Sequence, residues 1–145
     1  MRVLLPNGAT PSADPIADLL KKYKTIAVVG LSSNQMRPSN GVAAYLQGAG
    51  YRIIPVNPNE REVLGEKSYA KLTDVPARIE IVDVFRRADQ VMPTAEEAIA
   101  VGAKVLWMQL GVVNEKAAEK AHEAGLIVVM DACLLVEHKR RRGSL

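Results

Sequence analysis

The residues best suited to chemistry lie between Gly30 and Ser39, in the segment GLSSNQMRPS. This segment follows a short apolar run and precedes a helical pattern, so we expect it to leave a buried strand and enter a helix. The first N–H groups of a helix lack partners within it, and the helix dipole adds partial positive charge there. Ser32, Ser33 and Arg37 add side-chain donors. The segment predicts a phosphate site; the alternative is a turn whose serines only cap the helix.

The same segment lacks two common nucleotide-binding fingerprints. Only Gly30 fits G-x-G-x-x-G, since Ser32 and Gln35 stand at the later glycine positions, and no Walker sequence is present. NAD enzymes usually place an acidic residue at the end of the second strand, where this chain has Asn57 and Pro58. The missing carboxylate disfavours NAD and leaves NADP and coenzyme A open.

Strand and helix patterns alternate along the chain and indicate how these residues are positioned. Asp14 followed by Pro15 predicts a helix start, and Thr94 with Glu97 predicts a capping box. A further helix is expected from Asn114 to residue 124. Apolar strand-like runs occupy residues 25–29, 52–56, 79–84, 104–108 and 127–130. The pattern predicts a single-domain α/β protein with a Rossmann-like, doubly wound, five-stranded parallel sheet.

We expect three parts: an irregular N-terminal arm over 1–13, the Rossmann-type domain over 14–138, and a basic tail over 139–145. Ligands of open parallel sheets bind at the carboxyl ends of the strands, where the strand order reverses. The candidate site is therefore made of residues 30–39, 57–58, 84–86 and 109–111.

Several sequence blocks, in matching order over about 16–138, resemble the stand-alone CoA-binding domain family, a relative of the N-terminal domain of the succinyl-CoA synthetase α subunit. The blocks are AVVGLS at 27–32, RPS at 37–39, YRIIPVNP at 51–58, IVDVFRR at 81–87 and WMQLG at 107–111. The resemblance implies coenzyme A as ligand, with the first strand–helix loop at the pyrophosphate, the second strand end at the adenosine, and the third and fourth strand ends along the pantetheine arm. The residues so assigned are Gly30, Leu31, Ser32, Ser33, Arg37, Pro38, Ser39, Asn57, Pro58, Val84, Phe85, Arg86, Gln109 and Gly111.

Candidates for catalysis are few. We expect His122 to be a solvated helix residue and His138 to lie in the basic tail. Asp83 and Asp131 could be acid–base groups if burial raised their pKa values, but capping or pairing with neighbouring loops and arginines is the simpler interpretation. We therefore expect a binding module without catalysis of its own. The alternatives are an NADP-dependent reductase or an acyl-CoA-handling enzyme, and a scaffold whose basic tail meets an acidic partner.

The single cysteine, Cys133, fits a reducing compartment, and we expect a cytoplasmic protein. Cys133 is expected to be a small buried residue; the sharper hypothesis is a mixed disulfide with the thiol of coenzyme A. The net charge of +3 comes mostly from residues 139–142, which predicts a solvated tail rather than a nucleic-acid site. No apolar run is long enough to cross a membrane.

Overall fold

All five predicted strands form in the computed structural model, which describes residues 1–145. They pair in parallel, and two of them begin one or two residues later than predicted. The strands are β2 (Thr25–Val29), β3 (Arg52–Val56), β6 (Ile81–Val84), β7 (Val105–Met108) and β8 (Ile127–Met130). The sheet order β1-β8-β7-β6-β2-β3 means that the chain moves from β2 to β3 on one side and then returns to β6 on the other. The strand order therefore reverses at β2, where a ligand site is expected.

A sixth strand joins the sheet at its edge. Residues Arg2–Leu4 form β1, which pairs antiparallel with β8. The prediction of an irregular arm from residue 1 is wrong for these three residues, because three residues are too few to show a strand periodicity. The sheet is thus six-stranded and mostly parallel.

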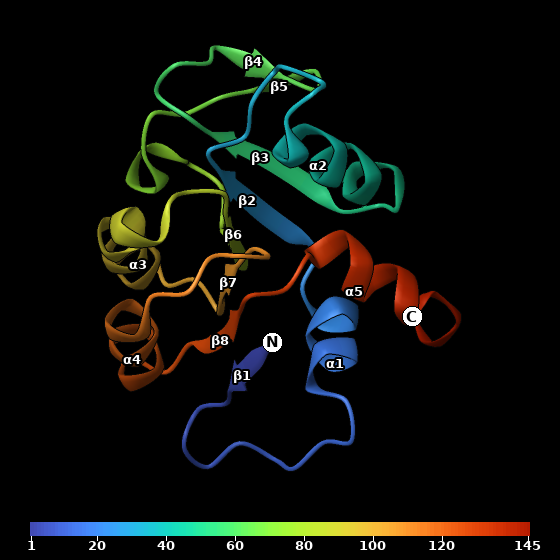
Figure 1. The fold of residues 1–145 in the computed structure, drawn as a ribbon, viewed down its shortest axis with the longest axis vertical. Coiled ribbons are helices and arrows are strands. Elements are labelled where there is room, and N and C mark those ends of the chain that lie inside the picture. The colour runs from blue at the N-terminus through green and yellow to red at the C-terminus, as the bar shows by residue number, and fades with distance from the viewer.

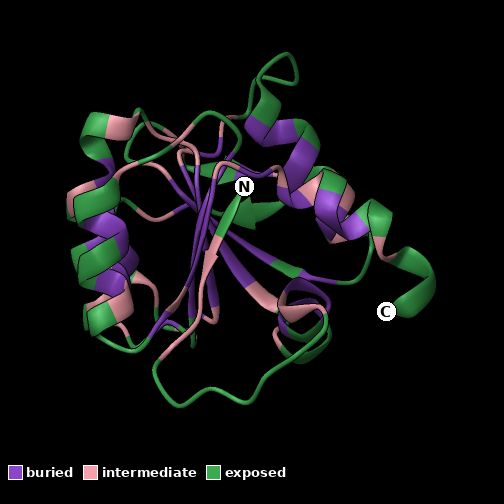
Figure 2. Ribbon diagram, turned by 60° about the horizontal axis from the view of Figure 1, so that its bottom comes forward, coloured by how far each residue is buried: buried purple, intermediate pink, exposed green.

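Helices cover both faces of this sheet, so the domain has three layers (Figure 1). α1 (Pro15–Lys22), α2 (Pro38–Gly48) and α5 (Leu134–Arg140) lie on one face; α3 (Val91–Ala100) and α4 (Glu115–Glu123) lie on the other. Alternate residues of each strand enter separate apolar clusters: Ile26 and Val28 face α1, α2 and α5, whereas Ala27 and Val29 face α3 and α4. The five parallel strands are mostly buried and the outer helix faces are exposed (Figure 2).

Two of the predicted helix starts are confirmed and one is wrong. Asp14 and Asn114 cap α1 and α4 by accepting hydrogen bonds from Ala17 N (3.2 Å) and Ala117 N (3.0 Å). The capping box at Thr94 does not form, because α3 already begins at Val91 and Thr94 is buried inside it. Its proposed partner, Glu97, instead accepts a hydrogen bond from Leu72 N at 2.9 Å.

Some elements were not predicted. The hairpin of β4 (Glu62–Val63) and β5 (Glu66–Lys67) follows β3, and α5 follows β8. Because α5 extends to Arg140 and a 3₁₀ turn follows over Arg142–Ser144, the basic tail is helical rather than loose. None of the helices is both long and apolar enough to cross a membrane.

Candidate functional site

A cleft of about 810 Å³ opens at the carboxyl ends of the central parallel strands, on both sides of the point where the strand order reverses. Its lining brings together most of the residues predicted from the sequence. Those that line it are Gly30, Ser32, Arg37, Pro38, Ser39, Asn57, Phe85, Arg86 and Gln109. Segments far apart in the sequence therefore form one concave surface, as expected for this sheet topology.

Five predicted residues do not line the cleft. Leu31 and Val84 are fully buried in the two apolar clusters. Ser33, Pro58 and Gly111 are exposed but lie outside the lining. The strand-end ranges taken from the sequence included them because sequence alone does not say which residues of a loop face inward.

Gly30 makes the tight turn at the end of β2. Its φ is +88°, and a Cβ at this position would lie 2.2 Å from the carbonyl oxygen of Phe85. A side chain would therefore clash with the backbone that follows β6. Glycine is required here first for packing between neighbouring strand ends, and not only to leave space for a phosphate.

The serines of the first loop hold the loop in shape. Ser39 Oγ accepts a hydrogen bond from Ser32 N at 3.1 Å, and Ser32 Oγ accepts one from Asn34 N at 3.0 Å. Asn40 Nδ2 donates to Ser32 O at 2.9 Å. Both hydroxyls are acceptors in these contacts, so each can still donate its own proton to a ligand. The capping interpretation and the ligand-binding interpretation are thus compatible.

Asn57 joins the end of β3 to the first loop. Its Nδ2 donates to Leu31 O at 3.0 Å, and its Oδ1 accepts from Asn59 N at 3.0 Å. No acidic residue stands directly at the end of β3, as the sequence shows, but Glu60, three residues after Asn57, lines the cleft and its Oε2 accepts a hydrogen bond from Ser33 N at 2.6 Å. The turn after β3 brings Glu60 back towards the first loop.

The charge of the cleft is mainly positive. Arg37, Arg86 and Arg87 line it, against the single carboxylate of Glu60. Neither Arg37 nor Arg86 forms an ion pair, whereas Arg87 makes only an exposed pair with Asp89 at 3.6 Å. Unpaired guanidinium groups beside the start of α2 are suited to phosphate oxygens.

The opposite end of the cleft is more apolar. Leu110, Val112 and Cys133 line it, and Gln109 is buried with its Oε1 accepting a hydrogen bond from Leu134 N at 3.0 Å. Gln109 thereby holds the start of α5. Leu110 lies in the predicted range 109–111. The lining residues outside all predicted ranges are Val42, Asn59, Glu60, Arg87, Val112 and Cys133. Extending each strand-end range by three residues would have found most of them.

Cys133 is half-buried rather than fully buried and lies at the rim of the cleft. The mixed-disulfide hypothesis stays a prediction, because it concerns a reaction and not a position. Its step is attack of the Cys133 thiolate on coenzyme A disulfide, which forms a protein–coenzyme A disulfide and releases one coenzyme A thiolate. Mass spectrometry after treatment with coenzyme A disulfide tests it: a Cys133 adduct supports the hypothesis, and an unmodified Cys133 rejects it.

The carboxylates considered as acid–base groups lie outside the lining. Asp83 is fully buried, neither carboxylate oxygen has a hydrogen-bond partner, and burial raises its pKa well above the ordinary value. The expectation that it pairs with a loop or an arginine is therefore wrong. For Asp131 the predicted pairing with a neighbouring loop is confirmed, since its Oδ1 accepts a hydrogen bond from Gly111 N at 2.7 Å.

The histidines differ from expectation. His122 Nε2 lies 2.7 Å from Leu5 O, so this helix residue is tied to the N-terminal segment rather than only solvated. His138 is buried in α5, with its Nδ1 2.8 Å from Tyr45 Oη. Neither lines the cleft.

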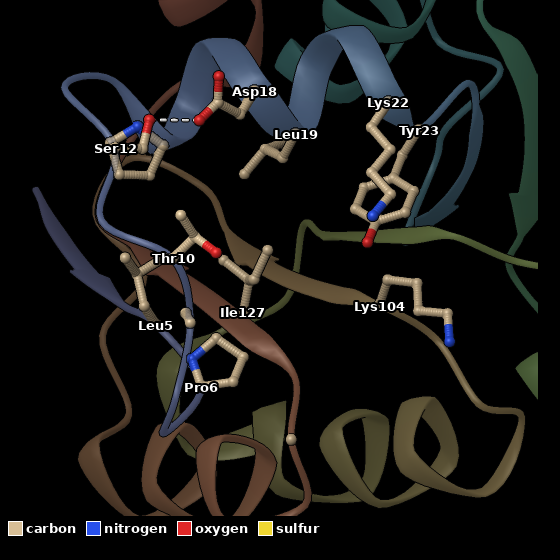
Figure 3. A pocket seen from close by; sticks show the side chains of 13 residues that line it. Leu5, Pro6, Thr10, Ser12, Asp18, Leu19, Lys22, Tyr23, Lys104 and Ile127 are labelled. Atoms are coloured by element: carbon tan, nitrogen blue, oxygen red, sulfur yellow. Dashed lines mark hydrogen bonds between the residues drawn. The ribbon is translucent and has the colours of Figure 1, made fainter.

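A second, smaller cavity of about 270 Å³ lies between the N-terminal segment and α1 (Figure 3). Leu5, Leu19 and Ile127 form apolar walls, and Lys22 and Tyr23 lie together at one end. None of the residues predicted to bind a ligand lines it. The cavity is at the other end of the strands from the cleft, next to the starts of β7 and β8.

Comparisons with known proteins agree with the fold and the family resemblance. A protein from Pyrococcus horikoshii OT3 superimposes with a TM-score of 0.86 at 43% identity, covering 97% of this chain and 98% of that one. YneT of Bacillus subtilis (strain 168) is 45% identical over 128 residues, which is 88% of this chain and 95% of YneT.

A larger protein contains a similar domain. The dinucleotide-forming acetyl-coenzyme A synthetase 1 of Ca. Korarchaeum cryptofilum, in complex with phosphate and ADP, matches with a TM-score of 0.66 at 25% identity, over 77% of this chain and 27% of the synthetase. The family model described as "CoA binding domain" matches residues 24–139, which include the whole cleft lining. The chain therefore belongs to the CoA-binding domain family.

Proposed function

We propose that this protein binds coenzyme A, or an acyl-coenzyme A, in the cleft at the carboxyl ends of β2, β3, β6 and β7. The observation that carries the proposal is the pair of arginines, Arg37 of the first loop and Arg86 after β6, which both line the cleft and have no carboxylate partner. Guanidinium groups without a carboxylate partner can form strong, charge-assisted hydrogen bonds with the phosphate oxygens of a multiply phosphorylated ligand. The cleft volume of about 810 Å³ is within the usual range for small-molecule sites.

The residues of the cleft fit different parts of the ligand. The loop around Ser32, the start of α2 at Ser39 and the side chain of Arg37 would hold the pyrophosphate. Asn57 would border the adenosine, with Arg86 along the nucleotide. The pantetheine arm would run towards the apolar end and place its thiol near Cys133.

We further propose that the protein is a binding module, with any reaction carried out elsewhere. Glu60 is the only carboxylate that lines the cleft, its Oε2 accepts a hydrogen bond from Ser33 N, and no histidine lines the cleft. The related synthetase carries the similar domain as about a quarter of a longer chain, at 27% of its length. A domain of this kind would deliver, store or sense coenzyme A in the cytoplasm.

The test is calorimetric titration with coenzyme A, acetyl-coenzyme A, NADP and NAD under identical conditions. Binding of coenzyme A in clear preference to both dinucleotides supports the proposal. Preferential binding of NADP would retain the fold, reject the proposed ligand and favour a reductase. Dephospho-coenzyme A, which lacks the ribose phosphate, is the matched control and should bind about tenfold or more weakly if a charged side chain contacts that phosphate.

A further inference from the structure

Another basic pocket, of about 700 Å³, lies at the amino ends of β2 and β3, whereas the cleft lies at their carboxyl ends. Lys24 and Tyr51 enter it from the residues directly before β2 and β3, and Tyr45 enters from the last turns of α2. His138 of α5 and Arg142 close the other side. None of these residues belongs to the coenzyme A cleft.

The polar side chains of this pocket form an ordered chain of hydrogen bonds. Arg142 Nη2 donates to Tyr45 Oη at 2.9 Å, and Tyr45 Oη lies 2.8 Å from His138 Nδ1. Because the arginine can only donate, the tyrosine proton is free to be given to His138 Nδ1. The proton of the neutral imidazole then sits on Nε2, which is left as a donor. The two tyrosine rings pack edge-on against the His138 ring, with centroids 5.3 and 5.5 Å away.

The cations of the pocket have no negative partner. Lys24 and Arg142 line the pocket, and Lys139 lies beside it over the Tyr45 ring. None of the three forms an ion pair, and no aspartate or glutamate side chain lines the pocket. They approach tyrosine rings instead, at 4.8 Å for Lys24 over Tyr51 and at 5.3 and 5.6 Å for the other two over Tyr45. Such unneutralised charge in a concave surface concentrates anions.

These cations are not needed to cap α2, whose carboxyl end borders the pocket. The carbonyl groups of its last turn already accept hydrogen bonds from the N–H groups of Ala49, Gly50 and Tyr51. Arg140 and Arg141, which neighbour Arg142 in sequence, show the contrasting arrangement, because both pair with Glu137. Lys24 Nζ donates to Leu20 O at 3.2 Å and Arg142 Nη2 donates to Tyr45 Oη at 2.9 Å, so each cation has one neutral partner and keeps further donors for a ligand.

We propose that this pocket binds a phosphate-bearing small molecule, held by Lys24, Arg142 and the Nε2–H of His138. The volume exceeds what one phosphate group requires, and the Tyr45 and Tyr51 rings provide apolar walls for the rest of the ligand. The concave shape favours a small anion over an extended polyanion. This site is independent of the proposed coenzyme A site.

The two histidines of the chain provide the test, since His138 is in the pocket and His122 is on α4. Pyrophosphate and ADP are titrated into an Arg37→Ala/Arg86→Ala variant, so that binding in the cleft is weakened, and the imidazole resonances are followed by NMR. Burial is the largest cause of the lowered pKa of His138, and the charges of Arg142 and Lys24 lower this pKa further. A bound phosphate offsets those charges and should raise that pKa, while the His122 resonances stay unchanged.

The polar groups that line the pocket around His138 are Lys24, Tyr45, Tyr51 and Arg142, with Leu145 beside them and Lys139 over the Tyr45 ring. The two charges that lower the pKa of His138 are those of Arg142 and Lys24. Adding Lys24→Ala and Arg142→Ala should weaken phosphate binding by at least about tenfold, whereas Lys116→Ala on α4 should not. Equal effects of pyrophosphate and ADP point to phosphate alone, and tighter ADP binding points to a nucleotide.

Three results would overturn the proposal: unmoved His138 resonances with both probes, unchanged affinity without the two cations, or a response only to an acidic peptide or oligonucleotide. Coenzyme A titrated into Lys24→Ala/Arg142→Ala should bind as in the wild type. The two proposals can therefore fail separately.

Discussion

The arginines of the cleft and those of the C-terminal segment lie in opposite environments. Arg141 is mostly buried, and its Nε and Nη1 bond to Asp14 and Glu137 at 2.8 and 2.9 Å. Arg37 and Arg86 have no carboxylate partner and face an open cleft. The comparison shows that arginines in a basic run can be structural, and that arginines outside this run can be the ones left free for a ligand.

The buried interior adds a third case, Asp83, which is charged in solution but has no partner in the fold. It lies on the face of β6 that packs under α1, α2 and α5, in register with Trp107 of β7 and Val28 of β2. Substitutions of Asp83, of these arginines and of Gly30, whose turn supports the cleft, separate the three environments.

Gly30→Ala should have the largest effect. The new Cβ would meet the Phe85 carbonyl oxygen at 2.2 Å, and the φ of +88° is unfavourable for alanine. We expect a loss of about 3 kcal/mol or more in the free energy of unfolding, measured by denaturant titration. Gly41→Ala is the control: nothing lies within 4 Å of its Cβ position, and it is in α2, so it should gain about 0.5–1 kcal/mol. Similar stabilities for the two variants would contradict the packing role of Gly30.

Asp83→Asn should change how stability depends on pH. Because burial raises the pKa of Asp83 in the folded state above its unfolded value, the folded state holds its proton more tightly. The contribution of Asp83 to the free energy of unfolding is therefore complete at pH values below the unfolded pKa. It falls as the pH rises towards the folded pKa, by up to about 1.4 kcal/mol per pH unit. The asparagine variant should lose this slope, which unfolding curves measured from acid to neutral pH would show. An unaltered slope would mean that Asp83 is not protonated in the folded protein.

Arg141→Ala should lower stability by about 1–3 kcal/mol, because it leaves the buried Glu137 without its internal partner. Arg140→Ala, which removes an exposed pair with the same glutamate, should cost less than about 1 kcal/mol. The hydrogen bond from Arg141 is the main reason that the pKa of Asp14 lies below its ordinary value. The associated stability is present above the unfolded pKa and is lost as pH falls through the folded one, so Arg141→Ala should reduce acid sensitivity. Equal losses of stability for both variants would contradict the different contributions of the buried Arg141 pair and the exposed Arg140 pair.

Arg37→Ala and Arg86→Ala should show the reverse behaviour. Each should leave the free energy of unfolding within about 0.5 kcal/mol of wild type, while weakening coenzyme A binding by about 1–3 kcal/mol in calorimetry. Arg78→Ala, an exposed arginine outside the cleft, should change neither quantity. Unchanged coenzyme A affinity in both cleft variants would make these arginines ordinary surface residues.

The sequence predicted the parallel strands and the location of the cleft because both depend on local patterns. Apolar runs predicted β2, β3 and β7. The rule that ligands bind where the strand order reverses then predicted that Gly30, Asn57 and Phe85 lie in one site. Features that depend on distant partners were missed. β1 exists because Val3 pairs with Val129, and Glu60 reaches the cleft only through the turn after β3. The structural role of Arg141 was missed for the same reason, because its partner Asp14 is 127 residues away in the chain.

The most direct test of the central claim is to follow backbone amide resonances while coenzyme A is added to the isotopically labelled protein. Binding in the cleft predicts the largest shifts in residues 30–39, 57–60, 85–87 and 109–112, with small ones around the α1 cavity and around His138. Shifts concentrated at Leu19, Tyr23 and Ile127, or at Tyr45 and His138, would place coenzyme A elsewhere and contradict the account.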